Sequence, residues 1–267
     1  MHPIERLRYV ARSSGAPQDL LVAETAAALL SFRDDHSGLV TACRRIVSRQ
    51  LTSGAIWWLA SRLLCANDVL AEARLAVDEI EGDTTSRSLA AALPDDATIA
   101  VAGWQTVVAS ALARRGDVEV LVIDVLGEAG SFCRHLSTRD VDAVDVPLSG
   151  LGAACAAADL VIIEASAVGT DSFLGVAGTR AAAAVAHSAG VPVWLVVGVG
   201  RVLPARIWEA LVGRLDLADE PWDADDEIVP FSLIDQFVGP GGLESVDEMM
   251  RRCDCPIAPE LFKADIT

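Results

Sequence analysis

The residues best suited to chemistry lie in one stretch, EASAVGTDSFLGVAGTR, which covers residues 164–180. Gly178 and Thr179 open a helix there, and the free backbone N–H groups at a helix start attract anions. Asp171 has the side chain of a general acid or base. However, a helix cap needs no ligand, and a lone aspartate in a loop is more often a turn former. The stretch is therefore consistent with an anion site, a catalytic acid or a simple turn.

The sequence contains no nucleotide or metal motif. It has neither GxGxxG nor a GxxxxGK followed by Ser or Thr, so an NAD or P-loop site is not supported. The six cysteines lie mostly in apolar segments and form no CxxC pair: Cys43, Cys65, Cys133, Cys155, Cys253 and Cys255. The last two form a lone CxC, whereas a structural metal needs about four ligands. We therefore expect free thiols, no metal and no cofactor.

The charge of the chain argues against nucleic acid and anionic membranes as partners. The formal net charge is −17, the acidic residues are spread along the chain, and Lys263 is the only lysine. Phosphate contacts need clustered basic side chains, which are missing. Strong acidity with little lysine suggests adaptation to a salty cytoplasm, so we expect a haloarchaeal type of protein.

Two features favour a cytoplasmic location. The opening segment MHPIERLRYV carries charges where a signal peptide needs an apolar core. The longest apolar stretch, residues 181–200, approaches the length of a membrane span but is interrupted by His187, Ser188, Gly190 and Pro192. A helix followed by a buried strand explains this stretch better.

The chain has two parts that differ in the spacing of their apolar residues. Residues 1–92 carry apolar side chains at helical spacing and predict a helical N-terminal domain. Trp57 and Trp58 cannot share one helix face, so one should enter the core and the other should meet the second part or a partner. Residues 98–267 alternate helices with short β-branched runs, at 98–103, 118–125, 141–149, 160–165 and 191–198. This alternation predicts an α/β fold with a Rossmann-like parallel sheet.

Ligands of such sheets bind beyond the carboxyl ends of the strands. These ends are expected at residues 103–106, 124–127, 164–179 and 198–201. Trp104 and Gln105, at the first of them, could form an apolar or amide-recognising pocket. Alternatively, Trp104 only fills the space left by ligand-binding groups that are missing.

Several strings in this order resemble a known family: SGA (14–16), TIAVAGWQTVV (98–108), VEVLVIDV (118–125), EIVPFSLIDQFVGPGG (227–242) and, most strongly, the segment 160–204 that contains GTRAAAAVAHSAGVPVWLVV. The family holds the alpha, beta and delta regulatory subunits of translation initiation factor 2B, methylthioribose-1-phosphate isomerase and ribose-1,5-bisphosphate isomerase. The resemblance implies a helical N-terminal domain on a Rossmann-like domain, usually as a homodimer or larger assembly. It also implies the isomerase chemistry, in which a cysteine and an aspartate move protons between two carbons of a phosphorylated sugar.

The residues that carry this chemistry in the isomerases are replaced here. Gly103 or Trp104 stands at the cysteine position, and Ser166 stands at the aspartate position. Ser14 stands where a phosphate-associated arginine is expected. These departures favour a non-catalytic protein that acts through assembly. The alternatives are an isomerase with a site rearranged around Asp124 or Asp171, and a family member with an unrelated ligand.

A remnant pocket for a phosphorylated small molecule is expected at the strand ends and the first helix. Its residues are Ser14, Gly15, Trp104, Gln105, Thr106, Asp124, Ser166, Gly178 and Thr179. The expected partners are further copies of the chain, forming a homo-oligomer, or another protein.

Overall fold

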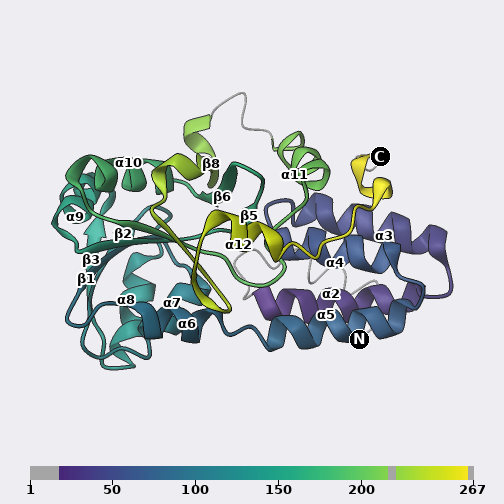
Figure 1. Ribbon diagram of the computed structural model, residues 1–267, viewed down its shortest axis with the longest axis horizontal. Helices are drawn as coiled ribbons and strands as arrows, with labels where there is room; N and C mark the ends of the chain where they lie inside the picture. Colours follow the sequence, from purple (N-terminus) through teal and green to yellow (C-terminus); the bar gives the residue numbers. More distant parts are fainter. Residues whose placement is uncertain (1–17, 216–220, 264–267) are drawn as a thin grey trace.

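The computed structural model describes residues 18–215 and 221–263, which form a group of packed helices beside a helix-covered sheet (Figure 1). This is the α/β architecture with a helical N-terminal part that the sequence predicts, and the prediction is confirmed. Ser14 and Gly15, expected at the site, lie outside the described residues. Within the described ranges, no helix is both long and apolar enough to cross a membrane.

Four helices form most of the helical part: α2 (Gln18–Leu29), α3 (His36–Arg49), α4 (Gly54–Cys65) and α5 (Val69–Glu81). Helix α4 is its centre, because every residue from Gly54 to Leu64 is buried. Both tryptophans are fully buried, and each indole N–H is satisfied. Trp57 donates to the Leu51 carbonyl at 2.9 Å, and Trp58 donates to Asp254 Oδ1 at 2.8 Å. Trp58 is therefore the one that meets a distant segment of the chain.

The main sheet has the strand order β10-β9-β7-β4-β1-β2-β3. Its strands are β1 (Thr98–Ala102), β2 (Glu119–Asp124), β3 (Asp142–Pro147), β4 (Leu160–Glu164), β7 (Val193–Val196), β9 (Gln236–Gly239) and β10 (Gly242–Glu244). All neighbours are parallel except β9 and β10. The chain runs outward from β1 to β3 and then crosses to β4 on the other side of β1. This is the doubly wound order of a Rossmann-like sheet, and it places a topological switch point between β1 and β4.

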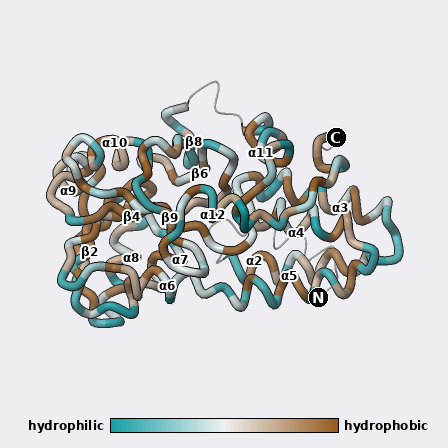
Figure 2. Tube along the Cα trace, viewed as in Figure 1, coloured by the Kyte–Doolittle hydropathy of each residue, from teal (hydrophilic) through white to brown (hydrophobic). Residues whose placement is uncertain are grey.

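Helices cover both faces of this sheet (Figure 1). One face packs against α6 (Thr85–Ala92), α7 (Thr106–Leu112) and α8 (Ala129–Ser137). The other packs against α9 (Leu151–Ala157), α10 (Thr179–Ala189) and α12 (Val246–Arg251). Along β1, Ile99 and Val101 join the first core and Ala100 joins the second. Burial on both faces explains why the inner strands β1, β4 and β7 are largely apolar, as the brown stretches in the sheet of Figure 2 show.

A small antiparallel sheet replaces the loop expected after residue 164. It consists of β5 (Ala167–Val168), β6 (Ser172–Val176) and β8 (Asp226–Pro230). Asp171 lies in the tight turn between β5 and β6, where Gly169 N donates to the Ser172 carbonyl at 2.8 Å. Its side chain is exposed and accepts a hydrogen bond from the Ser172 hydroxyl. Turn formation thus accounts for this aspartate.

The helical part and the sheet share their packing. Gly54 N, at the start of α4, donates to the Ser166 carbonyl at 2.9 Å, and a Cβ at Gly54 would lie 2.8 Å from that oxygen. Helix α11 (Ala205–Val212) and Leu261 join the core of the helical part, whereas α6 joins the core of the sheet. The domain boundary between residues 92 and 98 stays a prediction.

Asp226 gives the fold a pH dependence that can be tested. Burial, reinforced by the neighbouring Asp225 carboxylate, raises the pKa of Asp226 from 3.8 to about 6, although a hydrogen bond with Thr52 opposes the shift. The folded state therefore holds this proton more tightly than the unfolded state, and its stability falls as the pH rises through this interval. Asp226→Asn should raise the free energy of unfolding at neutral pH by about 2 kcal/mol.

Urea unfolding of the wild type and of Asp226→Asn, followed from about pH 7.5 to about pH 4, checks this prediction. The difference between the two proteins should shrink below about pH 6 and vanish near pH 4. Asp142→Asn, the same change on the exposed edge of the sheet, should stay within about 0.5 kcal/mol of the wild type. A gain at Asp226 that is independent of pH would contradict the explanation.

Candidate functional site

The switch point between β1 and β4 is occupied by a carboxylate of the chain itself. Glu164 is the last residue of β4, and its side chain lies at the start of α7, the helix that follows β1. Glu164 Oε2 accepts hydrogen bonds from Val107 N at 2.8 Å and Val108 N at 3.1 Å, and the Thr106 hydroxyl lies 3.3 Å from Oε1. These N–H groups are the ones with which a helix start binds an anion. Glu164 takes the place of that anion.

Arg201 neutralises this carboxylate from the loop after β7. Its Nη2 lies 2.7 Å from Glu164 Oε1, and its side chain is 4% exposed against 8% for Glu164. The guanidinium also donates to the Ala165 carbonyl at 2.5 Å and to Gln18 Oε1 at 2.6 Å. Gln18 opens α2, so one arginine connects β4, the loop after β7 and the helical part. Each nitrogen of the guanidinium already has one partner, and the charge of Arg201 is neutralised by Glu164, so Arg201 offers little attraction to a ligand phosphate.

Apolar side chains fill the space beside this pair. Gly103 and Gly178 have φ of +67° and +89°, a backbone region that suits glycine. Cβ atoms built on Gly103 and Gly178 would lie 3.0 Å and 2.8 Å from the two methyl groups of Val125. Val176 comes within 3.6 Å of the first of these positions. A valine therefore lies between Gly103, at the expected cysteine position, and Gly178, at the helix start expected to hold an anion.

Carboxylates also occupy two further helix starts at this edge, those of α8 and α10. Asp124 Oδ1, at the end of β2, accepts from Ala129 N of α8 at 3.2 Å. Glu227 Oε1, on β8, accepts from Arg180 N of α10 at 2.8 Å. Thr179, expected to help hold an anion, is fully buried, and its hydroxyl has no hydrogen-bond partner among the described residues. The three helices that follow β1, β2 and the small hairpin thus all begin on a carboxylate of the chain.

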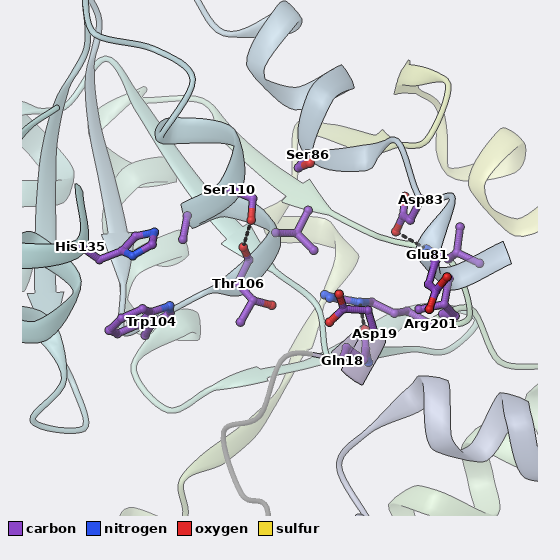
Figure 3. A pocket seen from close by; sticks show the side chains of 14 residues that line it. Gln18, Asp19, Glu81, Asp83, Ser86, Trp104, Thr106, Ser110, His135 and Arg201 are labelled. Atoms are coloured by element: carbon purple, nitrogen blue, oxygen red, sulfur yellow. Dashed lines mark hydrogen bonds between the residues drawn. The ribbon is translucent and has the colours of Figure 1, made fainter. Parts of the chain in front are cut away.

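The open space lies on the other side of α7, between the sheet and the helical part (Figure 3). It is a cavity of about 340 Å³. Its lining comes from α2, α5, α6, α7, α8 and the loop after β7: Gln18, Asp19, Ile80, Glu81, Asp83, Ser86, Trp104, Thr106, Val107, Ala109, Ser110, His135, Val199 and Arg201. This volume lies within the range of small-molecule sites.

Trp104 forms one wall of this cavity. Its ring stacks on Phe132 of α8, with centroids 5.4 Å apart and planes at 19°, and lies 5.6 Å from the His135 ring. The side chain is 37% exposed. The interpretation that Trp104 fills the space left by missing ligand groups is therefore wrong: Val125 and Val176 fill that space, and Trp104 leans toward α8.

The structure brings some of the expected site residues together and separates others. Trp104 and Thr106 line the cavity. The others that it describes do not: Gln105, Asp124, Ser166, Gly178 and Thr179. Gln105 is buried and donates to the Ala102 carbonyl at 2.9 Å, and Ser166 donates its hydroxyl to the Leu174 carbonyl at 3.0 Å. Roles in ligand binding for these residues stay predictions.

The cysteines do not supply an isomerase thiol to the cavity, because none of them lines it. Burial raises the pKa of the Cys43 thiol to about 12 and that of Cys155 to about 11. Burial also raises the thiol pKa of the others: Cys65, Cys133, Cys253 and Cys255. All six thiols therefore stay protonated at neutral pH, and the thiolate is the reactive form.

Sequence reasoning missed the residues that define this site. Glu164 and Arg201 are 37 positions apart, and Glu164 is 57 positions from the helix that it caps. One signal was available: a charged residue at the end of a buried strand must find a partner. Glu227 and His135 carried no comparable signal in the sequence.

The site and the doubly wound sheet define the class as a Rossmann-like α/β protein with a helical N-terminal part. Solved structures with this fold include translation initiation factor eIF-2B from Pyrococcus horikoshii OT3, with a TM-score of 0.74 and 14% identity over 90% of this chain and 96% of that one. Another is eIF2B beta from Chaetomium thermophilum, with a TM-score of 0.75 and 16% identity over 98% and 94%. A third is a subunit of the tetrameric eIF2B-beta2-delta2 complex from C. thermophilum, with a TM-score of 0.74 and 17% identity over 93% and 92%.

The chain therefore has the fold of the initiation factor 2B regulatory subunits, as the resemblance implied. At these identities the similarity establishes the fold alone. No protein-family model and no curated protein matches the chain.

The pair of Glu164 and Arg201 can be tested by a double-mutant cycle. Glu164→Gln should lower the free energy of unfolding by about 3 kcal/mol, because it leaves a buried guanidinium without its counter-charge. Arg201→Met should be similarly destabilising, since it leaves the carboxylate unpaired. The double variant should be more stable than the sum of the two changes predicts, by about 2 kcal/mol.

Urea unfolding of the four proteins measures this coupling. Glu119→Gln, at the exposed start of β2, is the matched control and should change the stability by less than about 0.5 kcal/mol. Additive effects of the two changes would mean that the pair does not act as a unit.

Proposed function

We propose that this chain is a non-catalytic protein of the initiation factor 2B type, which acts through assembly in the cytoplasm. One observation carries the proposal: the Glu164 carboxylate occupies the start of α7 at the switch point and is neutralised by Arg201. In doubly wound sheets this is the place where a ligand binds. Here the chain uses it to hold its own parts together.

The alternative of a rearranged sugar-phosphate isomerase finds less support in this geometry. Proton transfer between two carbons needs an acid and a base on either side of the substrate. Asp124 is engaged with α8, and Asp171 is exposed in a turn. Neither lines the cavity, and Val125 occupies the space between Gly103 and Gly178.

A phosphorylated ligand at the strand ends would have to displace a carboxylate of the chain. Glu164, Asp124 and Glu227 each accept a backbone N–H at a helix start. The charge of the buried Arg201 is already neutralised by Glu164. The expected phosphate site therefore receives little support, and the net charge of −17 likewise disfavours direct binding of nucleic acid.

The free edge of the sheet supports assembly. β3 is the terminal strand, and an unpaired edge strand presents backbone groups that can meet a partner. Val144 on β3 is 46% exposed, and Leu148, just after it, is 54% exposed. Leu126 follows Asp124, which pairs with Pro147, and it is 42% exposed. Such clustered apolar exposure favours a protein partner, which we propose to be a second copy of the chain.

An enzyme assay tests the absence of catalysis. The purified protein should convert neither methylthioribose-1-phosphate nor ribose-1,5-bisphosphate faster than buffer, because no acid and base flank a substrate space. Product formation can be followed by NMR, with added ketose product as the detection control. Turnover well above the buffer rate contradicts the proposal.

The molar mass in solution tests the assembly. Light scattering behind a sizing column, in high and low salt, should give a multiple of the chain mass of 28.0 kDa. Leu148→Asp should reduce this mass, because it introduces a charge into the proposed interface. Leu75→Asp, at a site on α5 that is 49% exposed, is the matched control and should leave the mass unchanged. A single species of 28.0 kDa in the wild type would overturn the role in assembly.

A further inference from the structure

The cavity between α7 and the helical part has a charge opposite to that of a phosphate-binding site. Its lining includes three carboxylates, on Asp19, Glu81 and Asp83. Among the described residues of the lining, the one guanidinium belongs to Arg201, which is 3% exposed and already paired with Glu164 at 2.7 Å. A molecule entering the cavity therefore meets a negative potential.

The carboxylates are held at one end of the space. Asp83 accepts from Thr85 N at 2.8 Å and from Val199 N at 3.0 Å, so it is fixed against the loop after β7. Glu81 is the last residue of α5, where the helix dipole disfavours a negative charge. Among the described residues its side chain forms no hydrogen bond or ion pair, so no part of the described fold accounts for its charge at this place. In Figure 3 Asp19 and Glu81 lie near each other, on the side away from Trp104.

Aromatic rings close the opposite end. Trp104 and His135 lie together across the first turn of α7 from the carboxylates (Figure 3). The Trp104 ring is fixed by stacking on Phe132 but remains 37% exposed, which leaves part of its surface open to the cavity. An indole surface attracts a cation as well as an apolar chain. The lining also contains the apolar side chains of Ile80, Val107 and Val199, beside the hydroxyls of Thr106 and Ser110.

From this arrangement we propose that the cavity binds a small linear organic cation of the amine or guanidine class. One positive group of the ligand would lie at Asp19 and Glu81, and its far end would lie against Trp104. The aliphatic chain between them would contact apolar side chains of the lining. This inference goes beyond the proposed role in assembly and does not depend on it. It replaces the expected phosphorylated ligand with one of opposite charge.

Titration calorimetry and thermal melting of the full chain, at constant ionic strength, test the proposal with agmatine and putrescine as probes. Both should bind saturably with one molecule per chain and raise the melting temperature. The affinity should fall as KCl is added, because the attraction is electrostatic. Ribose 5-phosphate and the neutral butanol should not bind.

Three variants locate the binding. Glu81→Gln should weaken agmatine by about fivefold, and its fold should persist because the change removes a charge that the helix dipole disfavours. Trp104→Leu should weaken it by about two- to fivefold. Glu209→Gln, the same charge change on the exposed surface of α11, is the matched control and should bind like the wild type.

Equal affinity in all four proteins would overturn the proposal, because it would show only general attraction to an acidic surface. Absence of saturable binding in the wild type, or tighter binding of ribose 5-phosphate, would overturn it as well. None of these outcomes bears on the molar mass in solution or on the isomerase assay, so the two proposals can fail separately.

Discussion

The buried ion pair of Glu164 and Arg201 constrains the rest of this structure. Two charges removed from water are tolerated only when hydrogen bonds compensate for the lost hydration. Glu164 has the first backbone N–H groups of α7 and the guanidinium, while Arg201 has Glu164, the Ala165 carbonyl and Gln18. These partners fix β4, α7, α2 and the loop after β7 relative to one another. A carboxylate so deeply involved in packing cannot also give way to a ligand.

The same arrangement recurs at the starts of α8 and α10, whereas α9 and α11 begin without a side-chain cap. A chain with 38 acidic residues and 21 lysine and arginine residues has more carboxylates than basic side chains that could neutralise them. Backbone N–H groups at helix starts offer partial positive charge without any basic side chain. Asp124 and Glu227 use it beside the sheet, as Asp35 and Asp68 do at the starts of α3 and α5. The acidic composition of the chain thus agrees with the use of carboxylates, and not of bound anions, at the starts of α7, α8 and α10.

The fold could be predicted because its causes are local. β-branched runs such as LVIIE and VEVLVID form strands that are buried on both faces, and the alternation with helices specifies a parallel sheet. The hairpin after Glu164 was missed because its strands are short and β6 contains a glycine, and the pairing of β6 with β8 joins residues at least 50 positions apart. Local patterns carry no information about such distant pairing.

The site was harder to predict, and the reason is physical. Replacement of the expected catalytic residues at Gly103 and Ser166 stays a prediction, which residue types alone allow. What fills the vacated space depends on the positions of side chains: Val125 between two glycines, and Glu164 turned onto the neighbouring helix. Whether Trp104 forms a pocket wall or only fills space likewise depends on its neighbours, here Phe132 and His135. The residue type defines which interactions a side chain can form, whereas the neighbouring residues in the fold determine which of these interactions it does form.

The similarity to initiation factor 2B subunits, at 14–17% identity, likewise describes the fold and not the site. The sheet order and the helix packing depend on apolar alternation, which many sequences satisfy. The edge of the sheet at the carboxyl ends of the strands depends on a few side chains. A single carboxylate at a helix start there replaces the partial positive charge of the backbone N–H groups with a negative charge. The fold can therefore persist while the charges at this edge differ, and function has to be inferred from the charges and contacts there.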